Sequence, residues 1–390
     1  MSRFSGVDEV LRGAAERGEV PGLVAMAATR EGVIYEGAFG RRSLPAGPAM
    51  TADTVFWIAS MTKAITSAAA MQLVEAGKLA LDRPIAGVLP ELAHPQVLEG
   101  FDAKGEPRLR PARRPITLRH LLTHTSGFVY DIWNPAMGRY LERRGIPGII
   151  SCENAALALP LVFDPGNRWD YGIGIDWAGK AVERASGRSL GQYLAENLFA
   201  PIGIKDTGFN LTQERRARLA GMHARGADGS LAGIEFELPQ QQEFEMGGGG
   251  LYGTAADYLA FERIFLDEGR AGGNTVLRPE TVRMMTENAI GGLEVRLLAT
   301  TNPAFSHDAE FFPGMVKKWG LGFMLTTAPV PGGLAAGSLA WAGLANTYFW
   351  IDPRAGVAGV VLMQWLPFAD PQALSLLDGF EKAIYAALRQ

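Results

Sequence analysis

Residues 56–74 read FWIASMTKAITSAAAMQLV, and this stretch decides how the chain folds. From Ala64 to Val74 the side chains are apolar or small nearly all round, which is typical of a helix buried at the centre of a protein. Gly77 supplies the stop signal for this helix. Ser60 is therefore predicted at the start of the helix and Lys63 one turn later on the same face, with their Cβ atoms about 5–6 Å apart.

This spacing of Ser60 and Lys63 indicates nucleophilic chemistry. A serine hydroxyl is a poor nucleophile until a base removes its proton. A lysine buried in an apolar helix has its charged form disfavoured, so it can exist neutral and accept that proton. The helix start also places the Ser60 backbone N–H where negative charge would develop. The alternative is that Ser60 only caps the helix and Lys63 extends to water, and this stretch alone leaves both interpretations open.

The two ends of the chain carry the strand signals. Runs rich in β-forming residues at Leu23–Thr29 and Val33–Gly40 flank a short turn, which predicts a hairpin. Apolar spacing predicts helices at the two extremes of the chain, and the same kind of analysis predicts three strands before the last helix. The predicted helices are Val7–Arg17 and Pro371–Leu388, and the strands are Ser338–Trp341, Thr347–Asp352 and Val357–Trp365.

We therefore expect an α+β fold in which both termini build one mainly antiparallel sheet flanked by helices. Residues 1–78 and 236–390 are predicted to form this domain. Residues 79–235 are predicted to be an inserted, mainly helical region, with helices at Leu118–Thr123, Ile175–Ala185 and Leu190–Phe199.

Composition excludes several classes of function. The 390 residues are 47% hydrophobic, with 37 lysines and arginines against 41 aspartates and glutamates, so the formal net charge is −4. No basic face is implied, which argues against nucleic acid as a partner. Cys152 is the only cysteine, so an internal disulfide is impossible. Charged residues interrupt the N-terminal segment and no run of about 18 apolar residues occurs, so we expect a cytoplasmic protein that does not span a membrane.

Two further segments carry candidate site residues. A loop with Pro165 and Gly166 delivers Tyr171 just before a predicted helix, although a surface aromatic is the simpler interpretation of that residue alone. Gly343 interrupts the strand that contains Trp341. A strand glycine marks either the close approach of a backbone to a ligand or a bulge, and the glycine alone does not decide between them.

Taken together, these blocks resemble the serine β-lactamase and penicillin-binding-protein superfamily. They are most similar to the family VIII carboxylesterases, which are themselves similar to class C β-lactamases. The resemblance runs over nearly the whole chain. It is carried by Ser60-Met61-Thr62-Lys63, His124-Thr125-Ser126-Gly127, Tyr171, Gly247 to Tyr258, and Trp341-Ala342-Gly343.

The resemblance implies a role for each of these residues. Ser60 would be the acylated nucleophile, Lys63 its activating partner and Tyr171 the residue that relays protons. The backbone N–H groups of Ser60 and Leu344 would form the oxyanion hole, and Tyr130 would line the pocket. We expect Lys63 and Tyr171 to titrate as a coupled pair in which the lysine charge favours the tyrosine phenolate.

Two departures from the superfamily pattern favour an esterase. Ile173 occupies the place of the asparagine in Tyr-x-Asn, and Trp341 that of the lysine in Lys-Thr-Gly. The missing groups would hold the amide and carboxylate of a penicillin-like substrate. We therefore expect Ile173, Trp341 and Gly343 to shape a pocket for small, short-chain or compact neutral esters. A change at Trp341 is expected to alter mainly substrate preference.

The predicted activity is hydrolysis of a small-molecule ester through a Ser60 acyl-enzyme, with no metal and no organic cofactor. The oligomeric state is left open. The alternatives are a β-lactamase, a D-amino-acid peptidase or an acyltransferase of the same superfamily. An alternative of another class is a catalytically silent penicillin-recognising protein.

Four other motifs are given structural interpretations. Gly187-Arg188-Ser189-Leu190-Gly191 matches a nucleophile elbow but lies between two predicted helices, so Ser189 is expected to cap a helix. His120 and His124 have zinc-site spacing but no evident third ligand. Gly247–Gly250 lacks the Lys-Ser/Thr of a phosphate loop and is expected to pack closely near the active site. Residues 108–114 are expected to be a solvated loop.

Overall fold

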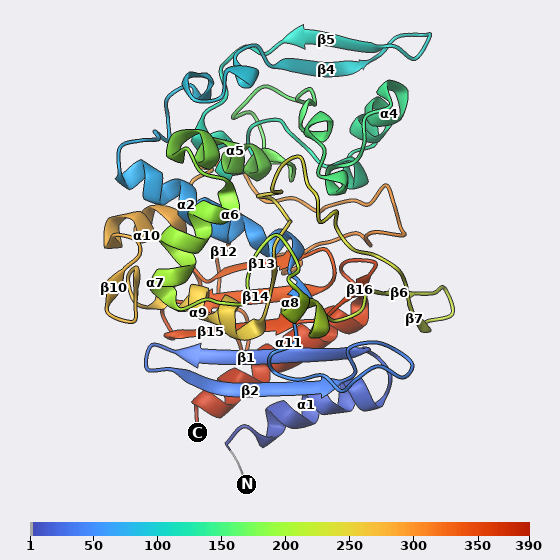
Figure 1. Cartoon of the computed structure of the whole chain (residues 1–390), viewed down its shortest axis with the longest axis vertical. Helices are drawn as coiled ribbons and strands as arrows, with labels where there is room; N and C mark the ends of the chain where they lie inside the picture. Colours follow the sequence, from blue (N-terminus) through green and yellow to red (C-terminus); the bar gives the residue numbers. More distant parts are fainter. Residues whose placement is uncertain (1–2) are drawn as a thin grey trace.

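The computed structural model describes residues 3–390, which are organised around one seven-stranded antiparallel sheet (Figure 1). Its strand order is β11-β12-β13-β14-β15-β1-β2. Strand β1 pairs with β15, and Met26 lies opposite Val360, so the first and last parts of the chain complete one sheet as predicted. The strands are β1 (Gly22–Thr29), β2 (Val33–Gly40), β11 (Lys317–Trp319), β12 (Met324–Thr326), β13 (Leu339–Gly343), β14 (Thr347–Asp352) and β15 (Val357–Leu362).

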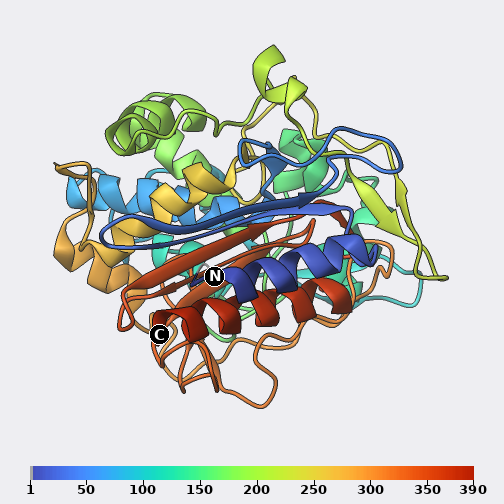
Figure 2. The same ribbon diagram turned by 90° about the horizontal axis from the view of Figure 1, so that it is seen from below.

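Helices cover both faces of this sheet. Helices α1 (Ser5–Glu16) and α11 (Pro371–Leu388) lie side by side beneath it (Figure 2). Helix α9 (Ala255–Leu266) packs on the other face, against β1 and β15. Every residue of β14 and β15 is buried, because a strand covered on both faces takes a continuous apolar run. The terminal helices and the three strands before the last helix are confirmed, except that residues 365–366 leave the sheet as a separate strand, β16 (Trp365–Leu366).

Helix α2 (Thr62–Glu75) lies between the sheet and the helical region, and the prediction that it is buried is confirmed (Figure 1). Every residue from Thr62 to Met71 is buried. The small side chains on this helix let its neighbours approach closely. Thr66, for example, donates from Oγ1 to the carbonyl of Gly247 at 2.7 Å.

The helical region holds the three predicted helices and several elements that were not predicted. The helices are α3 (Leu118–Leu122), α4 (Pro135–Arg144), α5 (Gly174–Ser186), α6 (Leu190–Leu194), which runs into a π-helical stretch (Ala195–Phe199), α7 (Ala200–Ile202) and α8 (Gln213–Ala217). The remaining short helix is α10 (Pro279–Thr286). The short strands are β3 (Phe56–Trp57), β4 (Gln96–Phe101), β5 (Pro107–Pro111), β6 (His223–Arg225), β7 (Leu231–Gly233), β8 (Tyr252–Gly253), β9 (Arg270–Ala271) and β10 (Asn274–Thr275). Because β6 pairs with β16, part of the predicted insertion joins the C-terminal segment; the boundaries at residues 78 and 236 stay predictions.

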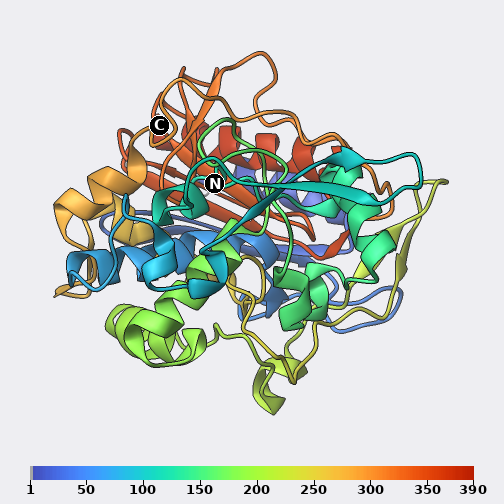
Figure 3. The same cartoon turned by 90° about the horizontal axis from the view of Figure 1, so that it is seen from above.

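Residues 108–114 are mostly exposed to solvent, as expected, but the expectation that the whole stretch is a loop was wrong. Residues 107–111 form β5, which pairs with β4 in a hairpin over the helical region (Figure 3). Arg110 donates two hydrogen bonds, of 2.9 and 2.8 Å, to the carboxylate of Asp164, and these bonds hold the pKa of Asp164 down at about 2. Asp164 begins the loop that carries Tyr171. The arginine therefore ties the hairpin to the segment that delivers a candidate site residue.

No helix among residues 3–390 combines the length and apolar character needed to cross a membrane.

Gly343 lets β13 pack directly against the segment that precedes Ser60. A Cβ atom at position 343 would lie 2.4 Å from the carbonyl oxygen of Ile58 and 2.2 Å from Oγ1 of Thr347. Ile58 and Thr347, which carry these two oxygen atoms, are both buried. The glycine is therefore required by packing between two protein segments.

Gly343→Ala is expected to destabilise the fold by about 2 kcal/mol or more, because an added methyl group in a tightly packed site forces the backbone apart. The shift in the urea unfolding midpoint measures this effect. Gly292→Ala is the matched control, since nothing lies within 4 Å of its Cβ position, and its effect should stay within about 0.5 kcal/mol. Equal midpoints for the two variants would contradict the packing role of Gly343.

Candidate active site

Ser60 lies on a short 3-10 turn, Ala59–Met61, immediately before α2. Ala59 has a φ of 44°, a left-handed conformation that is strained for a residue with a Cβ atom. The preceding segment is anchored on both sides. Trp57 donates its backbone N–H to Oε1 of Gln364 at 2.9 Å and its indole N–H to the carbonyl of Gly249 at 2.7 Å. The strained turn is thus held in place, and it presents Ser60 at the head of the helix.

Lys63 is fully buried, so the interpretation that it extends to water was wrong. Its Nζ donates to Ser60 Oγ at 3.1 Å, to the hydroxyl of Tyr130 at 2.9 Å and to the carbonyl of Gly248 at 2.5 Å. Burial lowers the pKa of Lys63, because the charged form loses its hydration. The side chain therefore has its three hydrogen-bond partners and a reduced preference for the ammonium form.

Tyr171 is brought to the same cluster by the loop that precedes α5. Its hydroxyl is hydrogen-bonded to Ser60 and accepts the indole N–H of Trp341 at 3.0 Å. Nζ of Lys63 lies 4.8 Å from the centre of the Tyr171 ring. The backbone carbonyl of Tyr171 accepts the N–H of Tyr130 at 3.1 Å, which joins the two tyrosine segments.

The expected Tyr171 phenolate is not supported by its surroundings. Burial raises the pKa of Tyr171 above that of a free phenol, and the hydrogen bonds from Ser60 and Trp341 only partly offset this effect. Burial likewise raises the pKa of Tyr130 and lowers that of His124, which packs against Tyr171 with ring centres 4.6 Å apart. These three residues are therefore neutral around pH 7.

Asp176 belongs to this cluster, and the sequence analysis missed it. It lies in the first turn of α5, is fully buried, and accepts the backbone N–H of Gly248 at Oδ1 over 2.8 Å. The carbonyl of the same glycine accepts from Lys63, so the backbone of this one residue links the carboxylate to the amine. Burial raises the pKa of Asp176, and the charge of Lys63 opposes this rise. The available sequence signal was an aspartate between Ile175 and Trp177 in an apolar helix.

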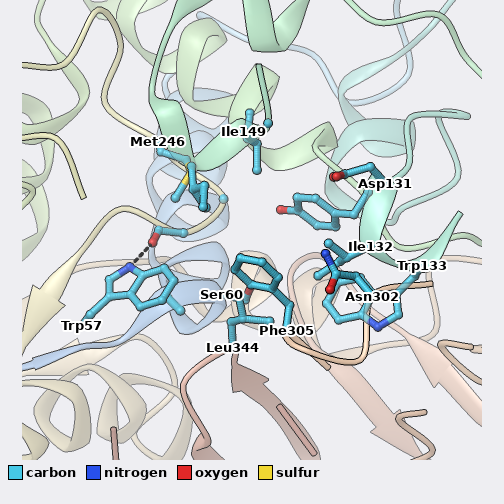
Figure 4. A pocket seen from close by; sticks show the side chains of 16 residues that line it. Trp57, Ser60, Asp131, Ile132, Trp133, Ile149, Met246, Asn302, Phe305 and Leu344 are labelled. Carbon is cyan, nitrogen blue, oxygen red and sulfur yellow. Dashed lines mark hydrogen bonds between the residues drawn. The ribbon is translucent and has the colours of Figure 1, made fainter. Parts of the chain in front are cut away.

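A cavity of about 140 Å³ opens in front of Ser60 and Leu344 (Figure 4). Trp57 and Met246 lie on one side of it, and Trp133 and Asn302 lie on the other. Within residues 3–390, neither the backbone N–H of Ser60 nor that of Leu344 donates a hydrogen bond. Two free N–H donors at one cavity wall are suited to hold an oxyanion.

Three predicted pocket residues lie elsewhere. Ile173 is buried at the start of α5, Gly343 packs against Ile58, and neither is among the residues that line the cavity. Trp341 does not line it either. Its ring packs on Tyr171 and Trp319, with ring centres 4.9 and 4.7 Å away, so its contact with Tyr171 replaces the substrate wall that we expected.

Three of the other motifs have structural roles. Ser189 caps α6 by accepting the N–H of Gln192 at 3.3 Å, as expected. His120 closes a capping box with Thr117. The glycine run packs closely at the cluster, since a Cβ atom on Gly248 would lie 2.4 Å from Oδ2 of Asp176. Among the described residues, no group of three or more His, Cys, Asp or Glu side chains is arranged to hold a metal ion.

Known proteins match both the sequence and this arrangement. Residues 7–378 match the family described as Beta-lactamase. Monacolin J acid methylbutanoyltransferase of Aspergillus terreus is 36% identical over 98% of this chain and 96% of its own length. Lovastatin esterase of Penicillium rubens is 33% identical over 97% of this chain and 98% of its own. The structure of a LovD6 mutant of simvastatin synthase from Aspergillus terreus superposes with a TM-score of 0.87 at 34% identity, and covers 100% of this chain and 98% of the other.

Fold and site thus define an enzyme of the serine hydrolase and acyltransferase class, built on the β-lactamase and penicillin-binding-protein fold. The chain belongs to the β-lactamase family. Its relatives include both an acyltransferase and an esterase.

Trp341→Phe should lower kcat for a small nitrophenyl ester by about five- to tenfold, because the phenyl ring keeps most of the packing while the hydrogen bond of about 1 kcal/mol to Tyr171 is lost. Steady-state kinetics measure this change. Trp350→Phe is the control, since its buried indole N–H has no partner in the described chain. A change confined to the relative rates of different substrates would instead restore the original expectation for Trp341.

Proposed function

We propose that this chain is a serine carboxylesterase that hydrolyses small, short-chain or compact esters through an acyl-enzyme on Ser60. The observation that carries the proposal is the meeting of three features at one cavity wall. Lys63 contacts Ser60 from the buried side, Tyr171 is hydrogen-bonded to the same hydroxyl, and two residues that line the cavity have backbone N–H groups without a partner in the described chain. This combination supplies a nucleophile, a base and an oxyanion hole.

The proposed reaction begins when Oγ of Ser60 attacks the ester carbonyl and its proton passes to neutral Lys63. The N–H groups of Ser60 and Leu344 hold the oxyanion that forms. Neutral Tyr171 gives its proton to the departing alcohol oxygen, and the proton held by Lys63 restores the phenol. Water then attacks the acyl-enzyme, and the same relay in reverse releases the acid and regenerates Ser60.

The cavity favours small substrates that carry no negative charge. No lysine, arginine or histidine is found among the described residues that line it. An anionic β-lactam would therefore lose its hydration without gaining a charged partner. The volume of about 140 Å³ is close to the ~150 Å³ cavity that accommodates benzene, which supports a compact acyl or alcohol group.

Transfer of the acyl group to an alcohol is a second candidate activity. It is favoured by the likeness to a methylbutanoyltransferase over nearly the whole chain. The proton relay treats water and an alcohol alike, since each must lose one proton as it attacks. The balance between the two is then set by which acceptor occupies the cavity.

The proposal is tested with a panel of nitrophenyl esters, a chromogenic cephalosporin and D-alanyl peptides, each with and without an added alcohol. The short nitrophenyl esters should turn over faster than the cephalosporin and the D-alanyl peptides, and an organophosphonate should label Ser60 alone by mass spectrometry. Ser60→Ala should fold normally and lose both activity and labelling. Equal rates on the cephalosporin would favour a β-lactamase, and faster turnover with alcohol would favour an acyltransferase.

Tyr171→Phe should reduce turnover on the order of a hundredfold or more, which is the usual effect of losing an acid–base group. Tyr130→Phe is the matched variant, because it removes a buried hydroxyl that contacts Lys63 at 2.9 Å. It should cost less than about tenfold, as expected for one neutral hydrogen bond. The rates of the two variants, Tyr171→Phe and Tyr130→Phe, are compared under single-turnover conditions. The reverse order would make Tyr130 the proton donor.

Asp176→Asn should move the acid limb of the pH–rate profile to lower pH. Burial lowers the pKa of Lys63, and the charge of Asp176 raises it, so removing that charge lowers the pKa further. Activity requires neutral Lys63 and rises as pH increases through this pKa, so the rise should begin at a lower pH. Asparagine can still accept the N–H of Gly248.

Asp257→Asn is the control for this experiment. Asp257 also accepts a backbone N–H, that of Asp206, at 2.7 Å, but it lies on α9 and has no interaction with Lys63. Its profile should match that of the wild type. If the acid limb of the Asp176→Asn profile lies at the same pH as in the wild type, Asp176 only holds the backbone of Gly248.

A further inference from the structure

Asp131 lines the cavity without a cationic partner. No described lysine, arginine or histidine interacts with its carboxylate, and only the backbone N–H groups of residues 131 and 132 are hydrogen-bonded to it. Burial raises its pKa, because the carboxylate is partly removed from water. A carboxylate in this position is stabilised by any cation that enters the cavity.

The turn that carries Asp131 is held rigidly against a distant loop. Thr301 donates its backbone N–H to the carbonyl of Ile132 at 2.9 Å and its hydroxyl to the carbonyl of Asp131 at 2.8 Å. The indole N–H of Trp133 donates to Oγ of Ser306 at 3.1 Å. These contacts use the backbone and the neighbouring indole, and they leave the Asp131 carboxylate at the cavity wall (Figure 4).

Aromatic rings form much of the remaining wall. Trp57, Tyr130, Trp133 and Phe305 all line the cavity, and the rings of Tyr130 and Trp133 lie 5.8 Å apart at 76°. The faces of such rings attract a cation within about 6 Å, and quaternary ammonium groups are recognised by several rings together. A carboxylate combined with aromatic faces and no basic side chain is the chemistry that binds an organic ammonium ion.

We propose that the cavity selects esters of cationic amino alcohols, with Asp131 and the surrounding aromatic rings as the specificity determinants. The inference rests on the proposed esterase function and names its substrate class. The ammonium group is placed in the alcohol portion, because the departing oxygen must face the proton donors. Tyr130 belongs to that cluster, and Asp131 is the next residue along the chain.

The test compares butyrylcholine with 3,3-dimethylbutyl butyrate, which has the same shape and replaces the ammonium nitrogen by carbon. The wild type should show a kcat/KM for the choline ester about tenfold higher than for its neutral counterpart, in line with a partly desolvated cation–π contact and an added charge. In Asp131→Asn this ratio should fall severalfold, because the charge is lost while the aromatic faces remain. A ratio near one in the wild type would overturn the proposal.

Asp308→Asn is the matched control, because Asp308 is an exposed acid on the same loop as Thr301 and accepts the N–H of Thr300 outside the cavity. It should keep the wild-type ratio. If both acids lower the ratio equally, the effect is one of overall charge and the cavity site is wrong.

A binding measurement separates this inference from the esterase proposal. Tetramethylammonium should bind to Ser60→Ala by calorimetric titration, and the binding should be lost when Asp131→Asn is added. Failure of ester turnover together with intact ammonium binding would overturn the esterase function and keep the cation site. Turnover of both esters without ammonium binding would overturn the cation site and keep the esterase.

Discussion

The burial of one amine is the constraint on which the rest of this structure depends. Lys63 lies within the apolar helix α2, where an unpartnered ammonium group would be very costly. Ser60, Tyr130 and Gly248 each supply an oxygen to it, and they come from three separated parts of the chain. The fold must therefore bring these parts together, and the same convergence that satisfies the lysine also creates the proposed catalytic cluster.

Close approach of backbones makes this convergence possible. The backbone of Gly248 bonds to Asp176 through its N–H and to Lys63 through its carbonyl, and any larger side chain there would collide with the carboxylate. Gly343 does the same between β13 and the segment before Ser60. Both glycines serve packing between protein segments, and Ser60 and Leu344 line the same cavity.

In the proposed reaction, the buried cluster behind Ser60 carries the chemistry, and the cavity in front of Ser60 carries the selectivity. The cluster behind Ser60 is buried, and it is suited to acyl transfer whatever the ester. The cavity in front of it is lined by aromatic and aliphatic groups with one unpaired carboxylate. Trp341 belongs to the buried cluster through Tyr171, although its place in the sequence had indicated the cavity wall.

The sequence by itself determined the elements with strong local signals and the placement of Ser60 and Lys63 one turn apart at the head of a buried helix. The terminal helices, the hairpin of β1 and β2, the buried helix α2 and the pair Ser60 and Lys63 were all predicted, because apolar periodicity and a buried lysine are local properties. Only the tertiary structure decided the roles of Asp176, Trp341 and Asp131. Asp176 and Trp341 contact residues that lie far away in the sequence, and Asp131 joins a cavity wall built from several separate segments. The hairpin of β4 and β5 likewise depends on such contacts, since Arg110 binds Asp164 beyond the hairpin as well as Glu99 within it.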